Sequence, residues 1–403
     1  MSCSSEDALA VKRSGWSKAF DPKVCFLALG TFAIGTDAYV ISGILASVAR
    51  DLHIGINAAG QLVSWYSFTY AVAAPVLAAF IGHLKKQNVV VGALILFAAA
   101  NAVCALSTTF EILVAARVVA AIAGSLYTPT AYTLAATLAA PEMKSKALAV
   151  VALGLTSATA LGVPIGTLIG QHAGWHGTFW LVVVLSLVAG LAIRAARVSS
   201  GDAALAPSPG LIARFKPLTH GSTLLALLPA VAIGSAYFLT YTYLGAILGA
   251  QGFPARQIAA VFVASGIGGV AGSFAGGQLG VRFKPVAVLV ATFVVLGIDA
   301  ALLAFSMLSF WTAALSLSIL SGSGWLFLPV QQSRLLKIVE PHHAQVVMAL
   351  NNSCVYLGSA AGTVIGAAII RAGVGLQDLH WASAALAVVA LATLALSYLR
   401  SGQ

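Results

Sequence analysis

The chain has 403 residues, of which 60% are hydrophobic and only 8% are charged, and its formal net charge is +10. Soluble proteins have about 25% charged residues, so this composition excludes an ordinary soluble protein and indicates an integral membrane protein. The positive charge does not cluster along one stretch as a nucleic-acid-binding surface requires, and we expect no nucleic-acid partner.

Long apolar runs recur along the whole chain. A helix that crosses a bilayer needs about 20 mostly apolar residues, and hydropathy with its polar breaks predicts twelve such helices. They are the segments 23–48, 58–82, 88–107, 111–139, 147–172, 177–196, 222–249, 256–281, 286–307, 310–336, 344–370 and 380–399. The runs are continuous and not alternating, which favours an all-α integral membrane protein over a β-barrel.

Basic residues are distributed unevenly between the two sides of the predicted membrane. With a cytoplasmic N-terminus, 17 of the 21 Lys and Arg residues fall on the cytoplasmic side, and Arg334 is one of these 17. Arg50, Arg256 and Arg371 fall outside, and Arg117 lies within a span. Cytoplasmic loops carry such an excess, so the pattern predicts that both termini are cytoplasmic. Residues 1–22 are expected to be a cytoplasmic tail and not a cleavable signal.

The two halves of the chain resemble each other. A polar stretch, 198–220, has the Ser, Gly and Pro content of a linker and separates a predicted N-terminal six-helix bundle, 23–197, from a C-terminal one, 221–400. Pairs of similar segments recur at an offset of about 200 residues: Ala33–Thr36 with Ala232–Ser235, Gly124–Pro129 with Gly324–Pro329, and Gly166–Gly170 with Gly362–Gly366. Parallel six-span repeats are a transporter architecture, with the substrate site at the repeat interface.

The fifth predicted span carries a glycine motif made up of Gly154, Gly162, Pro164, Gly166 and Gly170. Residues four apart share one helix face, and a glycine face lets helices approach closely in lipid. This motif resembles the antiporter motif of the twelve-span drug:proton antiporters of the major facilitator superfamily. The segment Arg117–Gly124 resembles the helix 4 motif of that family, whose arginine is implicated in proton coupling.

The resemblance extends from about residue 23 to 399, and it is to bacterial exporters of arabinose-like sugars, purine nucleosides and chloramphenicol. It implies the major facilitator fold of two pseudo-symmetric six-helix bundles, in a monomeric drug-resistance transporter of the cell inner membrane. Its partners would be a small-molecule substrate, protons and lipid, with the proton gradient as energy source and no cofactor or metal. The loop after the second span, Gly82–Gln87, lacks the acid that this family usually has there.

Three charged residues lie well inside predicted spans: Asp37, Arg117 and Asp299. A charge at bilayer depth costs roughly 2.5–3.5 kcal/mol on insertion scales, so such residues normally have a function. The repeat places Ala236 opposite Asp37 and about Leu317 opposite Arg117, which suggests that Asp37 and Arg117 carry proton coupling in the N-terminal half alone. A static ion pair is the structural alternative. Asp299 has no evident partner and is as compatible with a hydrogen-bonded structural acid as with a second proton site.

Aromatic and amide residues within the spans are the candidate substrate contacts, because binding sites combine apolar walls with a few polar groups. They are Tyr39, Tyr127, Tyr237, Tyr241, Trp325, Asn351, Asn352 and Tyr356, of which Tyr237 and Tyr241 share a helix face. Ordinary packing is the alternative for each.

Proton-coupled efflux by alternating access is the function that these features favour. A proton symporter or facilitator for nutrient uptake has the same fold and stays open as an alternative. A membrane enzyme or receptor is a third reading, but we find no nucleophile–base or metal constellation and no segment long enough for a signalling domain.

Overall fold

The computed structural model describes residues 21–80, 84–140, 143–198, 221–339 and 344–401. Over these ranges the chain is helical almost throughout and contains no β-strand. Nearly all of the predicted tail (1–22) and linker (198–220) lies outside the described residues, as do Gly82 and His83 of the loop after the second span.

Six spans make up the first half of the chain. They are formed by α2 (Val24–Asp51), α3 (Ile56–Phe80), α4 (Lys86–Leu106), α5 (Phe110–Leu138), α6 (Lys144–Ser157), the π-helical turn η2 (Ala158–Gly162) and α7 (Val163–Ala195). The fifth span consists of α6, η2 and the first part of α7. At Gly174 the backbone leaves the helical conformation, with φ 73° and ψ 163°, and the remainder of α7 is the sixth span. A positive φ is accessible to glycine at no steric cost, so this residue permits the reversal.

Six more spans follow in the second half. They are α9 (Gly221–Ala250), α10 (Ala255–Arg282), α11 (Pro285–Ser306), α12 (Phe310–Ile338), α13 (Ala344–Arg371) and α14 (Leu379–Ser401), with the short 3₁₀ turn η5 (Leu376–Asp378) before α14. Ten segments of the described chain are long and apolar enough to cross a membrane. One of them, Lys146–Ala195, contains the break at Gly174 and so supplies two spans. With α3 the total agrees with the twelve predicted, and the all-helical membrane fold is confirmed.

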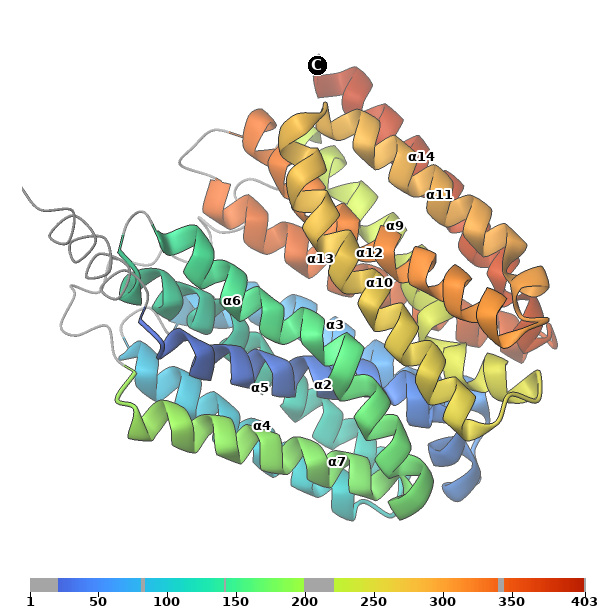
Figure 1. Ribbon diagram of the computed structural model, residues 1–403, viewed down its shortest axis with the longest axis horizontal. Coiled ribbons are helices and arrows are strands. Elements are labelled where there is room, and N and C mark those ends of the chain that lie inside the picture. The colour runs from blue at the N-terminus through green and yellow to red at the C-terminus, as the bar shows by residue number, and fades with distance from the viewer. Residues whose placement is uncertain (1–20, 81–83, 141–142, 199–220, 340–343, 402–403) are drawn as a thin grey trace, which may run out of the picture.

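The helices form two groups that lie side by side. Figure 1 shows α2 to α7 gathered in one half of the molecule and α9 to α14 in the other. The groups meet where α3 packs on α13, α2 on α9, and η2 on α10. The buried cluster that contains Tyr39 draws its side chains from both groups. The interface between the groups is therefore packed with side chains from both halves of the chain.

Glycines set how closely neighbouring helices approach. A side chain at Gly162 would collide with Oγ1 of Thr36 on α2, and one at Gly362 of α13 would collide with the backbone of Ser235 on α9. Because apolar helices gain little from hydrophobic burial in lipid, close van der Waals packing of this kind holds them together. The first span therefore packs on the fifth much as the seventh packs on the eleventh, as expected for a repeated unit.

Candidate functional site

A buried ion pair joins α2 to α5 in the middle of the first bundle. Arg117 Nη1 lies 2.6 Å from Asp37 Oδ1, and both side chains have a relative exposure of 0%. The pair leaves hydrogen-bonding capacity unused, because Asp37 Oδ2 and the Nε and Nη2 atoms of Arg117 have no hydrogen-bond partner among the described residues. Buried polar atoms are normally paired with protein or water, so this is a place where a proton, water or ligand polar group can be accommodated.

Tyr66 of α3 completes the surroundings of the pair. The guanidinium carbon of Arg117 lies 4.2 Å from the centre of the Tyr66 ring, within the range of a cation–π interaction. Tyr66 is buried, and its hydroxyl has no hydrogen-bond partner within the part of the chain that the structure describes. The sequence reasoning missed this residue. The one signal that could have found it is the spacing of Tyr66 and Tyr70 by four in one span, which places them on a common helix face.

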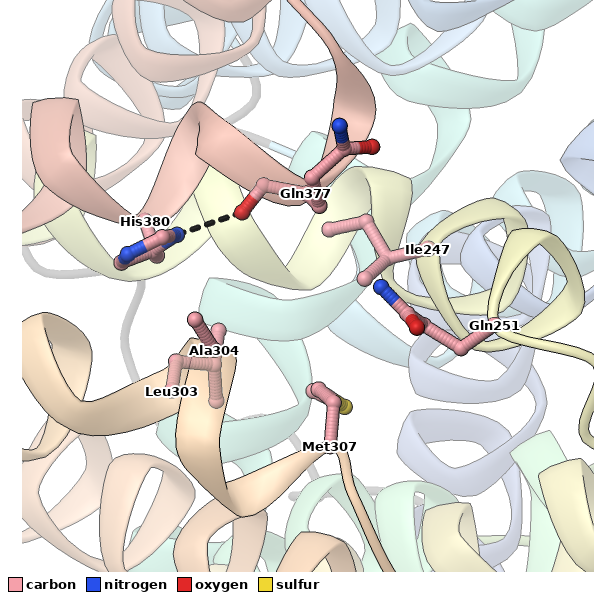
Figure 2. A pocket seen from close by; sticks show the side chains of 7 residues that line it. All are labelled: Ile247, Gln251, Leu303, Ala304, Met307, Gln377 and His380. Carbon is pink, nitrogen blue, oxygen red and sulfur yellow. Dashed lines mark hydrogen bonds between the residues drawn. The ribbon is translucent and has the colours of Figure 1, made fainter.

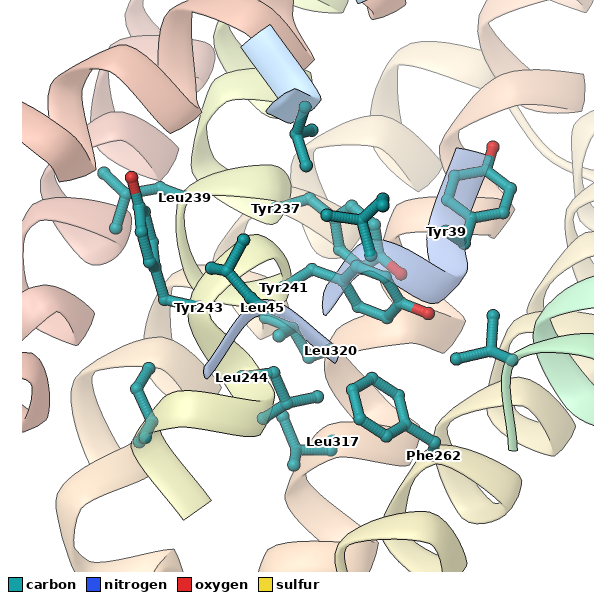
Figure 3. Close-up of a cluster of buried hydrophobic side chains, with 14 of the residues drawn as sticks. Tyr39, Leu45, Tyr237, Leu239, Tyr241, Tyr243, Leu244, Phe262, Leu317 and Leu320 are labelled. Atoms are coloured by element: carbon teal, nitrogen blue, oxygen red, sulfur yellow. The ribbon is translucent and has the colours of Figure 1, made fainter. Parts of the chain in front are cut away.

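An aromatic cluster lies where the two bundles meet. Tyr39 of α2 packs against Phe238, Tyr241 and Trp325 of the other bundle, at ring-centre distances of 6.1, 6.3 and 5.9 Å. Tyr237 and Tyr241 stack at 5.2 Å with an interplanar angle of 21°, which agrees with their predicted common face. Figure 3 shows the three tyrosine rings close together, with Phe262 of α10 beside Tyr241. The structure thus brings four predicted contact residues together and adds Phe238 to them.

Hydroxyl groups line one side of this cluster. The Tyr237 hydroxyl lies 3.2 Å from Ser321 Oγ, which in turn lies 2.6 Å from Ser265 Oγ. These three residues come from α9, α12 and α10, and all are buried. The sequence carries no signal for Ser265 or Ser321, because buried serines in Gly-rich helices look like ordinary small packing residues. Together the rings and hydroxyls form a buried, packed cluster that is mostly apolar with a few fixed polar groups, the composition usual for the lining of a small-molecule site.

The remaining predicted contact residues lie elsewhere. Tyr127 is buried within the first bundle, where its hydroxyl donates to the Leu27 carbonyl at 2.9 Å. Tyr356 of α13 stacks on Tyr70 of α3 at 3.9 Å. Asn351 is buried, with both polar atoms of its amide unpartnered within the described ranges, and Asn352 is half-buried. Contact with substrate stays a prediction for all eight residues.

Two further buried charges lie in the second bundle. Asp299 of α11 accepts a hydrogen bond of 2.9 Å from Ser316 Oγ, so it does have a local partner. Arg334, predicted to lie on the cytoplasmic side, has a side chain that is buried in α12 and donates from Nη2 to Ser397 Oγ at 2.6 Å. Hydropathy gives no sign of this burial, because Arg334 stands within the last two turns of a long helix.

The glycine motif of the fifth span faces α2. Side chains at Gly154, Gly166 and Gly170 would meet Ala28, Val40 and Ile44 respectively, and Pro164 is buried at the start of α7. Between Gly154 and Gly166 lies the π-helical turn η2, a feature that is frequent at functional sites. The motif therefore fixes the contact between the fifth span and the helix that carries Asp37.

A small pocket lies apart from this centre. It is formed by the ends of α9 and α11 and the start of α14, and Figure 2 shows its seven lining residues: Ile247, Gln251, Leu303, Ala304, Met307, Gln377 and His380. His380 Nδ1 lies 2.5 Å from the Gln377 carbonyl oxygen, so one ring nitrogen is already engaged. The pocket adds no residue to the candidate site. Within the described ranges, no three His, Cys, Asp or Glu side chains are placed to hold a metal ion.

The geometry matches a known family of membrane proteins. The profile of the Major Facilitator Superfamily matches residues 27–363. The chain belongs to the major facilitator superfamily. It is therefore a multi-pass transporter of small molecules, as the resemblance of its motifs predicted.

Individual relatives within the superfamily are similar over almost their whole length. The chain is 32% identical over 369 residues to a chloramphenicol resistance protein of Streptomyces lividans, covering 91% of this chain and 93% of that protein. It is 28% identical to the uncharacterized MFS-type transporter YtbD of Bacillus subtilis, covering 93% of this chain and 95% of that one.

Solved structures of superfamily transporters share the fold. A mutant of the nucleoside transporter NupG matches with a TM-score of 0.75 and 14% identity, over 93% of this chain and 99% of that one. A bacterial homologue of the human lysosomal transporter Spinster, in an inward-facing and occupied conformation, matches with a TM-score of 0.72 and 16% identity, over 94% and 97% of the two chains. At these identities the likeness extends to the fold alone.

Proposed function

We propose that this transporter exports a small organic solute in exchange for protons, by alternating access. The observation that carries the proposal is the buried Asp37–Arg117 pair, whose unpaired polar atoms lie in the bundle that also supplies Tyr39 to the aromatic cluster. A carboxyl group inside a membrane protein is the usual carrier of a transported proton. Arginine stays charged at all relevant pH values, so it can bias the acid without titrating itself.

The asymmetry of the repeat supports a coupling role for this pair. The positions that correspond to Asp37 and Arg117 are Ala236 and about Leu317, and both are buried apolar residues in the second bundle. A charge needed only to hold a six-helix bundle together would be expected in both halves. Since the second bundle packs without it, we assign the pair to proton binding and release.

The aromatic cluster defines the kind of solute. Tyr39, Phe238, Tyr241 and Trp325 offer ring faces and edges, while the Tyr237 hydroxyl supplies a polar anchor. Such a surface suits an uncharged solute that has an aromatic or apolar ring and some hydrogen-bonding groups. The Streptomyces lividans relative is a chloramphenicol resistance protein, which makes chloramphenicol the first solute to test, followed by purine nucleosides and arabinose.

Orientation and energy source complete the proposal. The distribution of Lys and Arg supports an inner-membrane protein with both termini in the cytoplasm. Protons would then enter from outside through Asp37 while solute leaves, with no cofactor and with one chain as the transporting unit. Uptake by proton symport is the alternative, and it differs in the direction of solute movement for a given pH gradient.

Transport by purified protein in proteoliposomes tests the proposal. An inwardly acidic gradient should drive radiolabelled chloramphenicol into vesicles that carry the protein, and an inwardly alkaline gradient should not. Asp37→Asn should abolish this gradient-driven movement, whereas exchange of solute across the membrane without a gradient should persist. Asp299→Asn is the matched control, because it removes another buried acid, one that bonds a serine hydroxyl.

Three results would contradict parts of the proposal. Full gradient-driven transport by Asp37→Asn would exclude Asp37 as the coupling acid. Accumulation under the opposite gradient would indicate symport. Absence of flux for every solute class would exclude the export function altogether, provided that a cooperative thermal unfolding transition shows the protein to be folded.

A further inference from the structure

A continuous series of aromatic contacts runs from the ion pair to the opposite bundle. The guanidinium of Arg117 lies over the Tyr66 ring at 4.2 Å, Tyr66 stacks on Tyr70 at 6.4 Å, and Tyr70 stacks on Tyr356 at 3.9 Å. Tyr66 and Tyr70 belong to α3, whereas Tyr356 belongs to α13 of the other bundle. The group proposed to bind the proton is therefore linked by packed side chains to the interface between the bundles.

A hydrogen bond reinforces the far end of this series. Ser67 Oγ of α3 lies 2.9 Å from Ser359 Oγ of α13, and both serines are buried. Ser67 and Tyr70 are three residues apart, as are Tyr356 and Ser359, so each pair occupies one helix face. The stacked rings and the hydroxyl pair thus form one contact patch, made up of Ser67, Tyr70, Tyr356 and Ser359, between two antiparallel helices.

The rings of Tyr66 and Tyr70 both lie against Gly124 of α5. A methyl group added at Gly124 of α5 would lie 3.2 Å from the Tyr66 hydroxyl oxygen and 3.5 Å from Cε2 of Tyr70. Close-packed interiors transmit displacement because they have few voids to absorb it. A shift of the Tyr66 ring therefore changes its contacts with Tyr70 and with α5.

Arg117 is the group whose position depends on the charge of Asp37. Its guanidinium interacts with a carboxylate on one side and with a ring on the other. The other titratable groups that interact with the carboxyl, among the described residues, are Tyr66 of α3 and Cys104 of α4. When Asp37 takes up a proton, the attraction that holds the guanidinium at 2.6 Å is lost, while the attraction to the Tyr66 ring remains.

We propose that Tyr66, Tyr70 and Tyr356 are positioning residues that link protonation of Asp37 to the α3–α13 contact patch between the bundles. The inference rests on the proposed function. In it, Tyr356 transmits movement between the bundles and does not contact the substrate. The movement of one bundle against the other then begins with protonation of Asp37. A neutral Asp37 changes the forces on Tyr66, and the series passes that change to the patch where α3 contacts the other bundle.

Spin-label distances across the two bundles test the link without requiring transport. Cysteines would replace Phe80 at the end of α3 and Leu336 near the end of α12, both well exposed, in a background with the native cysteines changed to alanine. Pulsed electron paramagnetic resonance then measures the distance distribution in mildly acid and mildly alkaline buffer. Tyr356→Leu removes the stack, and Tyr356→Phe keeps it as the matched control.

The parent protein and Tyr356→Phe should change their distance distribution with pH, and Tyr356→Leu should lose that change while keeping its thermal unfolding transition. Tyr66→Leu and Tyr66→Phe should behave in the same way. A pH response that is equal in the Leu and Phe variants would overturn the link, as would a parent protein with no pH response.

Transport measurements separate this inference from the proposed function. Tyr70→Leu, which removes the same stack, should still exchange solute without a gradient but lose most of its accumulation under a pH gradient, whereas Tyr70→Phe should keep both. If Tyr70→Leu accumulates solute as well as the parent does, the link is excluded and proton-coupled export stands. If Asp37→Asn retains gradient-driven transport, the coupling acid is misassigned and the link falls with it.

Discussion

The energetic coupling between Asp37 and Arg117 can be measured directly. At 2.6 Å and an effective dielectric constant of about 20, their mutual attraction is about 6 kcal/mol before desolvation is subtracted. Removing one partner of a buried pair typically costs about 3–5 kcal/mol, because the other charge is left uncompensated. We therefore expect Arg117→Met and Asp37→Leu each to lower the free energy of unfolding by about 3–5 kcal/mol.

The double variant Asp37→Leu/Arg117→Met should be more stable than either single variant. Replacing both charges with apolar groups leaves no buried charge at this position, and such replacements are often neutral or stabilising. Thermal unfolding in detergent, followed by the fluorescence of the seven tryptophans, should show a fall of roughly 6 °C or more for each single variant. Asp299→Asn should change the unfolding temperature far less, since its partner is the neutral hydroxyl of Ser316.

Additive losses in the double variant would refute this reasoning. If the double variant lost the sum of the two single losses, the two side chains would not be energetically coupled. The two side chains would then be adjacent without stabilising each other. Arg117 would have no demonstrated influence on proton binding by Asp37, and the proposed proton site would lose its physical basis.

Three further predictions concern packing, orientation and the aromatic cluster. Gly362→Val should cost about 1–3 kcal/mol by overpacking the α9–α13 contact, whereas Gly92→Ala, with nothing within 4 Å, should be neutral or slightly stabilising; thermal unfolding measures both. Cysteines at Arg282 and Arg256, the exposed ends of α10, should react with an impermeant maleimide from opposite faces of the membrane, and labelling from one face would refute the topology. Trp325→Leu should raise the solute dissociation constant roughly two- to tenfold through loss of its ring contact while Trp325→Phe changes it less, and equal affinities would remove Trp325 from the site.

Most of the fold could be predicted from the sequence because lipid imposes a simple rule. An apolar run of sufficient length must be a helix, since every backbone polar group has to be satisfied within the segment. The lipid environment also makes Asp37 and Arg117 exceptional, because a charged side chain at bilayer depth is costly. Their proximity did not follow from the rule, because it depends on how α2 and α5 are rotated about their axes.

The side chains that surround the pair could not be predicted for the same reason. Tyr66 and Tyr70 look like any aromatic residues in a span, and only the packing of α3 against α5 and α13 gives them distinct neighbours. Arg334 shows the converse limit. Its position near a helix end decides neither exposure nor burial, and in the structure the helix continues past it to Ile338 and its side chain is buried.

The π-helical turn η2 keeps the glycines of the fifth span in register. A π-turn holds one residue more than the α-helix does, so Gly154 and Gly166 both face α2 although twelve α-helical steps of about 100° would separate them. Deleting one residue within Ala158–Gly162 would leave a regular α-helix in which these glycines still share a face. The corresponding helix α13 is α-helical from Ala344 to Arg371, so a deletion between Gly358 and Gly362 would turn the following glycines away from α9. The two halves of the gene should therefore tolerate one-residue deletions differently, with the fifth span the more tolerant.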